Sequence, residues 1–383
     1  MKRLWGLMGL ILAGTAGAVE GKLAPYGSVG VGYESNVFQA PSTLVGVADP
    51  VRGDIFYRTV VGLDAGMKVV DGGKVFILFD HEENHFSSHS VLNNYGTEVR
   101  AGYRQAWGGH WAAGLTGQWE NQNERGVDVD GVPLTQTYAY RALDISPRLE
   151  WNGEPFSATG RTEATLTFTR RVADYDNPPS TPSVQAQDYT QSEIGLRLVQ
   201  NYPDRYAAAF EYTLGKRDYD DYLARLGGPA SVEGDATTDG TRRSQKDHRL
   251  TASWERNIRP GTWWEVGAKA VLRDDGYQNY FSYKQMGLYA KGKVRFESRR
   301  ELSGKISYAR RSYDVQTLSL ADATKRKMSL LNAGVTGTQP LTDRLKAFLK
   351  YDLEVQGSNV KSNASPLQGF TDQTVFAGMS AEW

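Results

Sequence analysis

VFAGMSAEW, residues 375–383, closes the chain with a regular alternation of side chains. Its odd-numbered residues are apolar or small: Val375, Ala377, Met379, Ala381 and Trp383. The residues between them are mostly polar or tiny. A period of two places successive side chains on opposite faces of a β-strand. The stretch therefore predicts a strand with one apolar face and one polar face.

Segments with the same alternation recur along the whole chain. About sixteen of them follow one another, with no convincing helical pattern between them. A soluble sheet of that size would leave unpaired edges or need helices to cover it. A closed barrel with lipid outside and water inside needs neither. We therefore predict an all-β protein, a transmembrane antiparallel up-and-down β-barrel of about sixteen strands, within a range of about 14–18.

The predicted strands are joined by two kinds of connection. Tight turns such as Asp71-Gly72-Gly73, Gly108-Gly109 and Asn152-Gly153 follow even-numbered strands. Longer polar connections follow odd-numbered strands, at residues 39–54, 121–136, 175–187, 219–246, 316–325 and 358–368. Bacterial barrels have short periplasmic turns and longer extracellular loops. The alternation therefore predicts an even strand number, with both termini in the periplasm.

The start of the chain has the pattern of a secretory signal peptide. A positively charged beginning precedes an apolar run at residues 4–12, which is too short to span a bilayer as a helix. Ala16-Gly17-Ala18 fits the small-residue cleavage pattern. We expect residues 1–18 to be removed and residues 19–383 to form the barrel. An uncleaved N-terminal membrane anchor is the alternative.

The composition excludes several kinds of site. The chain has no cysteine, which excludes disulfides, Cys-ligated zinc, iron–sulfur clusters and a thiol nucleophile. Its 44 Lys and Arg residues balance 44 Asp and Glu residues, so no overall basic field points to a nucleic acid. We expect no cofactor and no nucleic-acid partner.

Tryptophans flank the predicted tight turns and the end of the chain. They are Trp107, Trp111, Trp151, Trp263, Trp264 and Trp383. An amphipathic ring is most stable at a membrane interface. The positions predict an aromatic girdle at the periplasmic side, and packing inside a soluble sandwich is the alternative.

No constellation of residues for catalysis or metal binding is evident. His81, His85 and His89 are spaced four residues apart. On one strand face that spacing corresponds to about 13 Å, which is too far for a shared metal ion. We expect a solvated strand end there. The chain also lacks a G-x-S-x-G nucleophile elbow. We predict that the protein is not an enzyme, with no catalytic residue and no metal ligand.

Charged residues recur on the face opposite the apolar one, where a water-filled lumen tolerates them and a dry core would not. The predicted pore-lining residues are Arg58, Asp64, Arg100, Arg104, Glu120, Arg148, Glu163, Arg197, Lys269, Lys291, Lys293, Arg295, Lys305, Lys346 and Lys350. Residues 27–32 are rich in glycine, and we expect small inward residues there to leave space in the lumen.

Several of these cations are expected to form one basic wall. They are Lys291, Lys293, Arg295, Lys305, Arg311, Lys346 and Lys350. We hypothesise that this wall guides an anionic or hydroxyl-rich solute. The alternative is that lumen charges only keep the pore wet and pair across strands.

The end of the first predicted strand carries a short motif. The motif consists of Tyr33, Glu34, Ser35, Asn36, Val37 and Phe38. It resembles the Y-(D/E)-(S/D)-N-(V/I)-(F/Y) signature of the β-barrel porin family of outer-membrane proteins linked to exopolysaccharide biosynthesis and export (EpsL-type). Members of that family often carry Asp in place of Glu34, and Phe in place of Trp383.

The resemblance implies a pore in the cell outer membrane that moves a secreted exopolysaccharide. It implies four partners: outer-membrane lipid, the barrel assembly machinery, the polysaccharide and a periplasmic export component. Trp383 resembles the terminal aromatic residue that the assembly machinery recognises. We expect passive passage, with Tyr289 and Phe348 stacking on sugar faces. A general or substrate-specific diffusion porin is the alternative, and an outer-membrane enzyme or adhesive barrel is a further one.

Overall fold

The computed structural model describes residues 21–39, 52–127, 133–154, 160–176, 188–203, 205–223, 240–277, 279–319, 322–360 and 369–383. The predicted signal peptide lies outside these residues. The described residues form sixteen strands and one short 3₁₀ helix, η1 (Ser90–Leu92). None of their helices is long and apolar enough to cross a membrane.

The strands follow one another in chain order. Their bounds are β1 (Gly21–Glu34), β2 (Asp54–Val70), β3 (Gly73–Phe86), β4 (Asn94–Trp107), β5 (Trp111–Val127), β6 (Pro133–Gly153), β7 (Arg161–Tyr175), β8 (Tyr189–Asn201), β9 (Tyr206–Leu223), β10 (Arg242–Arg259), β11 (Thr262–Asp275), β12 (Tyr283–Arg295), β13 (Glu301–Ser319), β14 (Asp322–Pro340), β15 (Leu345–Ser358) and β16 (Phe370–Glu382).

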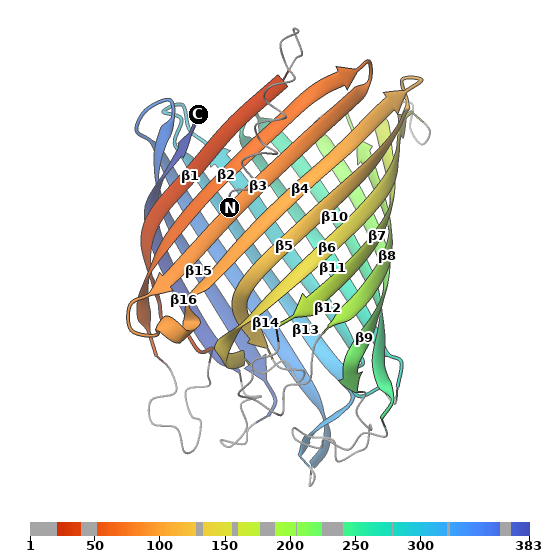
Figure 1. Ribbon diagram of the computed structural model, residues 1–383, viewed down its shortest axis with the longest axis vertical. Coiled ribbons are helices and arrows are strands. Elements are labelled where there is room, and N and C mark those ends of the chain that lie inside the picture. Colours follow the sequence, from red (N-terminus) through yellow and green to blue (C-terminus); the bar gives the residue numbers. More distant parts are fainter. Residues whose placement is uncertain are drawn as a thin grey trace.

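Each strand pairs antiparallel with the next one, and β16 returns to pair with β1 (Figure 1). The closing register sets Val29 opposite Met379 and Tyr33 opposite Val375. The sheet therefore has no free edge, and the barrel satisfies its own backbone hydrogen bonds all round. The prediction of a closed sixteen-stranded up-and-down barrel is confirmed.

The two ends of the barrel differ. Tight turns after even-numbered strands lie at one end, together with Trp383, and we call this the turn end (Figure 1). The backbone N–H of Trp383 donates to the carbonyl of Pro25 at 3.0 Å, which fixes the end of the chain beside β1. The odd-numbered strands end at the opposite end of the barrel, which we call the loop end (Figure 1). The predicted alternation of connections is confirmed.

Several strands extend further toward the loop end than the sequence predicted. The pairing of β5 with β6 continues to Val127 opposite Pro133. Likewise β9 and β10 pair to Leu223, and β13 and β14 pair to Ser319. The predicted connections at residues 121–136, 219–246 and 316–325 are therefore partly strand. The sequence signal was apolar alternation, which stops at the edge of the apolar belt, whereas backbone hydrogen bonds continue beyond it. The seventh strand also begins later than predicted, at Arg161.

One face of the sheet is apolar and exposed. Residues directly opposite each other on paired strands point to the same face. Met286 and Leu288 of β12 keep 72% and 69% of their surface exposed. Val29, Leu115 and Val335 are exposed in the same way on other strands. A continuous exposed apolar face of this size fits lipid rather than water.

Tryptophans gather on this outer face at the turn end. Trp107, Trp111 and Trp151 lie directly opposite one another on β4, β5 and β6. Trp263 differs from the prediction, because it lies opposite Lys293 on the inner face, while Trp264 faces outward. Successive residues on a strand must face opposite sides, so only one of this pair can join the outer girdle.

Candidate functional site

The inner face of the barrel is polar, and side chains reach across whole strands on it. Arg104 of β4 contacts Glu150 of β6 at 2.6 Å, across the intervening strand β5. Arg171 of β7 contacts Glu120 of β5 at 2.5 Å. Contacts between alternate strands need the concave side of a curved sheet, where side chains converge. This concave side is the candidate functional site.

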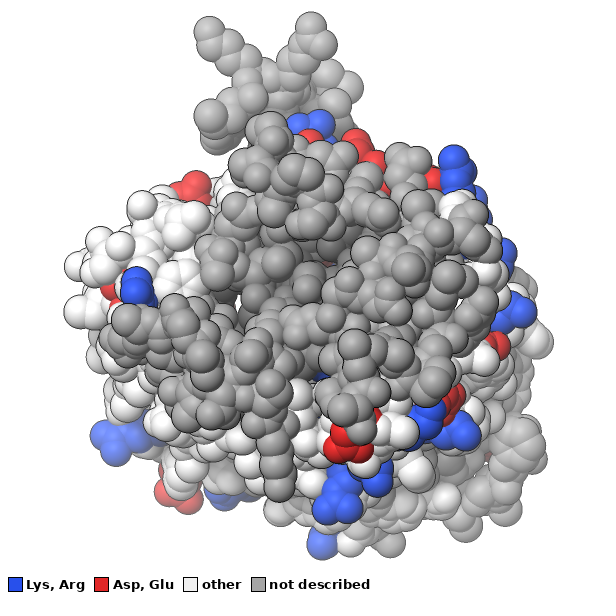
Figure 2. Space-filling model, turned by 90° about the horizontal axis from the view of Figure 1, so that it is seen from below, with Lys and Arg blue, Asp and Glu red and all other residues white. Residues whose placement is uncertain are grey.

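The strand pairings place the predicted pore-lining residues on this inner face. They are Arg58, Asp64, Arg100, Arg104, Glu120, Arg148, Glu163, Arg197, Lys269, Lys291, Lys293, Arg295, Lys305, Lys346 and Lys350. Whether they line a conducting pore remains a prediction. Around the loop-end rim, positive and negative side chains lie next to each other (Figure 2).

Most of these charges are paired with an opposite charge. Around β2 to β7 the ion pairs are Arg58–Glu82 at 3.1 Å, Asp64–Lys22 at 2.5 Å, Arg100–Glu98 at 2.8 Å and Arg148–Glu150 at 2.9 Å. Glu163 instead accepts a hydrogen bond from Asn201 Nδ2 at 3.1 Å. The carboxylate beside each of these cations lowers the positive electrostatic potential of this half of the wall.

The predicted basic wall is interleaved with carboxylates. Its ion pairs are Lys291–Glu265 at 2.8 Å, Lys293–Glu301 at 2.7 Å, Arg295–Glu301 at 3.8 Å, Lys305–Asp352 at 3.6 Å, Lys346–Glu382 at 2.9 Å and Lys350–Asp352 at 2.7 Å. Arg311 is the exception, and it bonds to the neutral side chain of Gln285. The wall is therefore an ion-pair ladder that carries charges of both signs. The pairing agrees with the alternative, in which lumen charges pair with one another.

A recess of about 630 Å³ opens in the inner wall between β8 and β14. Arg197 and Lys269 line it, and neither makes an ion pair with any described residue. Lys269 lies 5.0 Å from the ring centroid of Tyr289. The hydroxyl of Tyr289 donates to Glu265 at 2.6 Å, and its ring lies where a side chain at Gly267 would stand. The recess thus combines these two cations and one oriented aromatic ring with the carboxylates of Glu211, Glu255 and Glu265.

Nearer the loop end, arginines lie over tyrosine rings, a feature that the sequence analysis missed. The guanidinium carbon of Arg217 lies 3.9 Å from the ring centroid of Tyr189. That of Arg311 lies 4.3 Å from the ring centroid of Tyr283. The sequence does carry a signal for these contacts, because Y-x-Q and then R-x-Y occur on two consecutive strands, twice. Single-strand alternation does not reveal it, since the contacts join different strands.

The glycines of β1 do not leave open space, contrary to expectation. A Cβ atom at Gly30 would lie 2.5 Å from the Phe376 ring, and one at Gly32 would lie 2.4 Å from the Phe56 ring. The Phe56 and Phe376 rings stack at 5.7 Å across β1. Phe348 packs against Phe376 at 5.3 Å, so its ring belongs to this cluster. The glycines make room for aromatic side chains from neighbouring strands.

The motif after β1 closes over the seam between β1 and β16. Asn36 is fully buried, and its backbone N–H donates to Asp372 Oδ1 at 3.0 Å. Its side-chain amide donates to the carbonyl of Thr371 at 3.2 Å. Val37 is also fully buried and packs in the cluster with Phe56 and Phe376. These contacts give the motif a structural role at the seam.

The histidines do not share one face. His81 and His85 point outward from β3, and both contact Glu83, at 3.1 Å each. His89 lies beyond the end of β3 and contacts Asp54 at 3.0 Å, because the chain turns into η1 there. Among the described residues, no group of three or more His, Cys, Asp or Glu side chains is placed to hold a metal ion.

Comparisons with known proteins bear on the fold alone. No family model and no curated protein matches the sequence. CdiB from Escherichia coli matches 94% of this chain and 63% of its own, with a TM-score of 0.50 and 11% identity. CdiB from Acinetobacter baumannii matches 94% of this chain and 60% of its own, with a TM-score of 0.48 and 7% identity.

A further match is OmpT, an outer membrane protein of Vibrio cholerae. It covers 95% of this chain and 99% of its own, with a TM-score of 0.45 and 10% identity. The match to CdiB from Escherichia coli, at a TM-score of 0.50, supports the β-barrel fold of this chain. The chain spans less than two thirds of the length of either CdiB structure.

Proposed function

We propose that the protein is an outer-membrane pore through which a secreted exopolysaccharide leaves the cell. The contrast between the two faces of the closed wall carries the proposal. The outer face exposes apolar side chains such as Leu288, with a row of tryptophans at one end. The inner face carries ion pairs such as Arg104–Glu150. Lipid outside and water inside account for both faces.

The choice of a polysaccharide rests on the motif and on the chemistry of the wall. Residues 33–38 resemble the signature of the EpsL-type family. The wall also presents hydroxyl groups beside its charges, as at Thr165, Thr167 and Thr169 of β7. Such groups exchange hydrogen bonds with sugar hydroxyls at little cost, because each replaces a similar bond to water. Passage is passive, driven by synthesis or by a periplasmic partner.

The proposal includes an orientation and a set of partners. Residues 1–18 are a cleaved signal, and both termini lie in the periplasm, so the turn end faces the periplasm. Trp383 keeps 61% of its surface exposed at this end, where the barrel assembly machinery can recognise it. Outer-membrane lipid contacts the apolar belt, and a periplasmic export component delivers the polysaccharide.

A diffusion porin is the second candidate. The ion-pair ladder of β11 to β15 favours it, because paired charges keep a lumen hydrated without selecting one solute. An enzyme or an adhesive barrel has no comparable feature in its favour.

Deletion of the gene tests the export proposal. We expect the deletion strain to release much less extracellular polysaccharide, and the full-length chain to restore its release. Conductance of the purified protein in a lipid bilayer separates the two candidates. Normal polysaccharide release from the deletion strain, together with open conductance, would reject export and favour the diffusion porin.

A further inference from the structure

Two units of the same composition lie on the inner face near the loop end. Each has Tyr-x-Gln on one strand and Arg-x-Tyr on the next, with Tyr opposite Tyr and Gln opposite Arg. The Arg217 unit, on β8 and β9, consists of Tyr189, Gln191, Arg217 and Tyr219. The Arg311 unit, on β12 and β13, consists of Tyr283, Gln285, Arg311 and Tyr313.

Both units hold the guanidinium group in the same way. Arg217 Nε donates to Gln191 Oε1 at 2.6 Å, and Arg311 Nε donates to Gln285 Oε1 at 2.9 Å. Each guanidinium lies over the ring of the first tyrosine, as given above. That ring is buried, with 6% of Tyr189 and 7% of Tyr283 exposed. The guanidinium group thus lies over a buried ring and is itself half-buried.

The orienting partner in each unit is a neutral amide. Arg104 and Lys291 are each paired with a glutamate. Neither Arg217 nor Arg311 makes an ion pair with any described residue, and their Nη2 groups make no hydrogen bond with those residues. A guanidinium has five N–H donors in a planar fork that matches a carboxylate. The amide therefore orients each fork without neutralising it.

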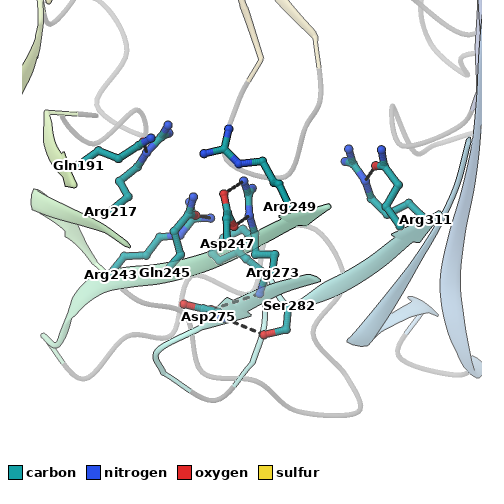
Figure 3. A network of polar contacts seen from close by, with 12 residues as sticks. Gln191, Arg217, Arg243, Gln245, Asp247, Arg249, Arg273, Asp275, Ser282 and Arg311 are labelled. Atoms are coloured by element: carbon teal, nitrogen blue, oxygen red, sulfur yellow. Dashed lines mark hydrogen bonds and ion pairs between the residues drawn. The ribbon is translucent and has the colours of Figure 1, made fainter. Parts of the chain in front are cut away.

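Further cations lie between the two units, and others lie on the inner wall nearer the turn end. Arg273 binds both oxygens of Asp247 at 2.8 Å, and Arg249 pairs with Glu193. Figure 3 shows Arg217, Arg249 and Arg311 on the same side of the sheet, with Asp247 and Arg273 between them. Arg197 and Lys269, the two cations of the recess, lie further toward the turn end, and neither makes an ion pair with described residues. We define the cationic track as Arg217, Arg311, Arg197 and Lys269.

We propose that the cationic track binds the carboxylate groups of an acidic polysaccharide. This inference rests on the proposed function and names the class of glycan. The two units are four strands apart, or about 19 Å along the wall at about 4.8 Å per strand. A small anion can occupy only one of them. A chain that carries repeated carboxylates can bridge both, and its second contact is then favoured by high effective concentration.

Block of the ion current through the purified full-length protein in a planar bilayer tests the proposal. The probes are an oligogalacturonate of defined length, a neutral malto-oligosaccharide of the same length and monomeric galacturonate. We expect the oligogalacturonate to block at much lower concentration than either other probe. In Arg217→Gln/Arg311→Gln its apparent affinity should fall by more than about tenfold, since each lost charged contact contributes about that factor.

The matched control changes the same amount of charge on the opposite face. Lys284→Gln/Arg310→Gln lies on β12 and β13 with both side chains facing outward. We expect it to keep the wild-type block. Heat-dependent mobility on a denaturing gel checks that both double variants are folded barrels.

Three results would overturn the inference. They are equal block by the neutral oligosaccharide, equal block of the Arg217→Gln/Arg311→Gln variant, and monomeric galacturonate binding as tightly as the oligomer. If polysaccharide release still depends on the gene, such a result rejects only the binding of carboxylates by the cationic track and leaves the export proposal standing. Normal release by the deletion strain rejects export, whatever the block.

Discussion

The backbone N–H of Asn36 donates to Asp372 Oδ1 at 3.0 Å, joining two residues 336 positions apart in the sequence. Ser35 Oγ donates to the same carboxylate oxygen at 3.3 Å. These bonds lie where β1 meets β16, the one pairing in the barrel that joins the two ends of the chain. The buried carboxylate of Asp372 therefore helps to hold the seam closed at the loop end.

Asp372→Ala should lower the free energy of unfolding by about 1–3 kcal/mol, because it leaves the buried N–H of Asn36 without its acceptor. Urea unfolding in lipid vesicles, followed by tryptophan fluorescence, measures the change. Asp71→Ala serves as control, since Asp71 lies in an exposed tight turn. Equal stability of Asp372→Ala and wild type would show that the seam does not depend on this carboxylate.

Gly32→Ala should destabilise the barrel by about 1–3 kcal/mol. The added Cβ would lie 2.4 Å from the Phe56 ring and 2.8 Å from the carbonyl oxygen of Val375, so that ring has to leave its stack. The same unfolding measurement applies. In Gly117→Ala the new methyl meets nothing within 4 Å, and its stability should stay near wild type. A Gly32→Ala protein as stable as Gly117→Ala would contradict the packing argument.

Glu150→Gln should shift ion selectivity toward anions. Glu150 contacts both Arg104 at 2.6 Å and Arg148 at 2.9 Å, so its loss leaves two cations facing one neutral group. The reversal potential under a salt gradient in a planar bilayer reports the shift. Adding Arg148→Gln to this variant should restore most of the wild-type value. An unchanged reversal potential would mean that ions do not pass near this group.

Trp111→Ala should weaken the folded state in lipid by about 0.5–3 kcal/mol. Trp111 lies between Trp107 and Trp151 on the outer face, where an indole ring anchors a barrel at the membrane interface. Trp263→Ala provides the contrast, because that ring faces the lumen opposite Lys293. We expect Trp263→Ala to alter conductance more than stability. Equal losses of stability in lipid would argue against the outer girdle.

Much of the fold was predictable because strand alternation is a local property. Met379 was assigned to the apolar face from its own neighbours, and its pairing with Val29 follows once the sheet is closed. Tight turns marked by Gly108-Gly109 set the order of the strands. Boundaries were less predictable at the loop end, because hydrogen-bonded pairing extends past the apolar pattern, as at Val127.

The candidate site was predictable only by face. The sequence places Arg104 and Lys291 inside, but their glutamate partners lie on other strands. The partner of Arg104 lies 46 positions away, across an intervening strand, and no local pattern selects it. Trp263 was misplaced for a related reason, since composition near a turn does not distinguish two successive residues on opposite faces.

By itself the sequence determined a closed barrel with an apolar exterior, a charged interior and different ends, because side-chain period and turn chemistry act over a few residues. The tertiary structure alone decided which charges are neutralised. Lys291 lies beside a carboxylate, whereas Arg217 lies beside an amide and over the Tyr189 ring. That difference arises from strand register and barrel curvature, which bring together groups that are distant in the chain.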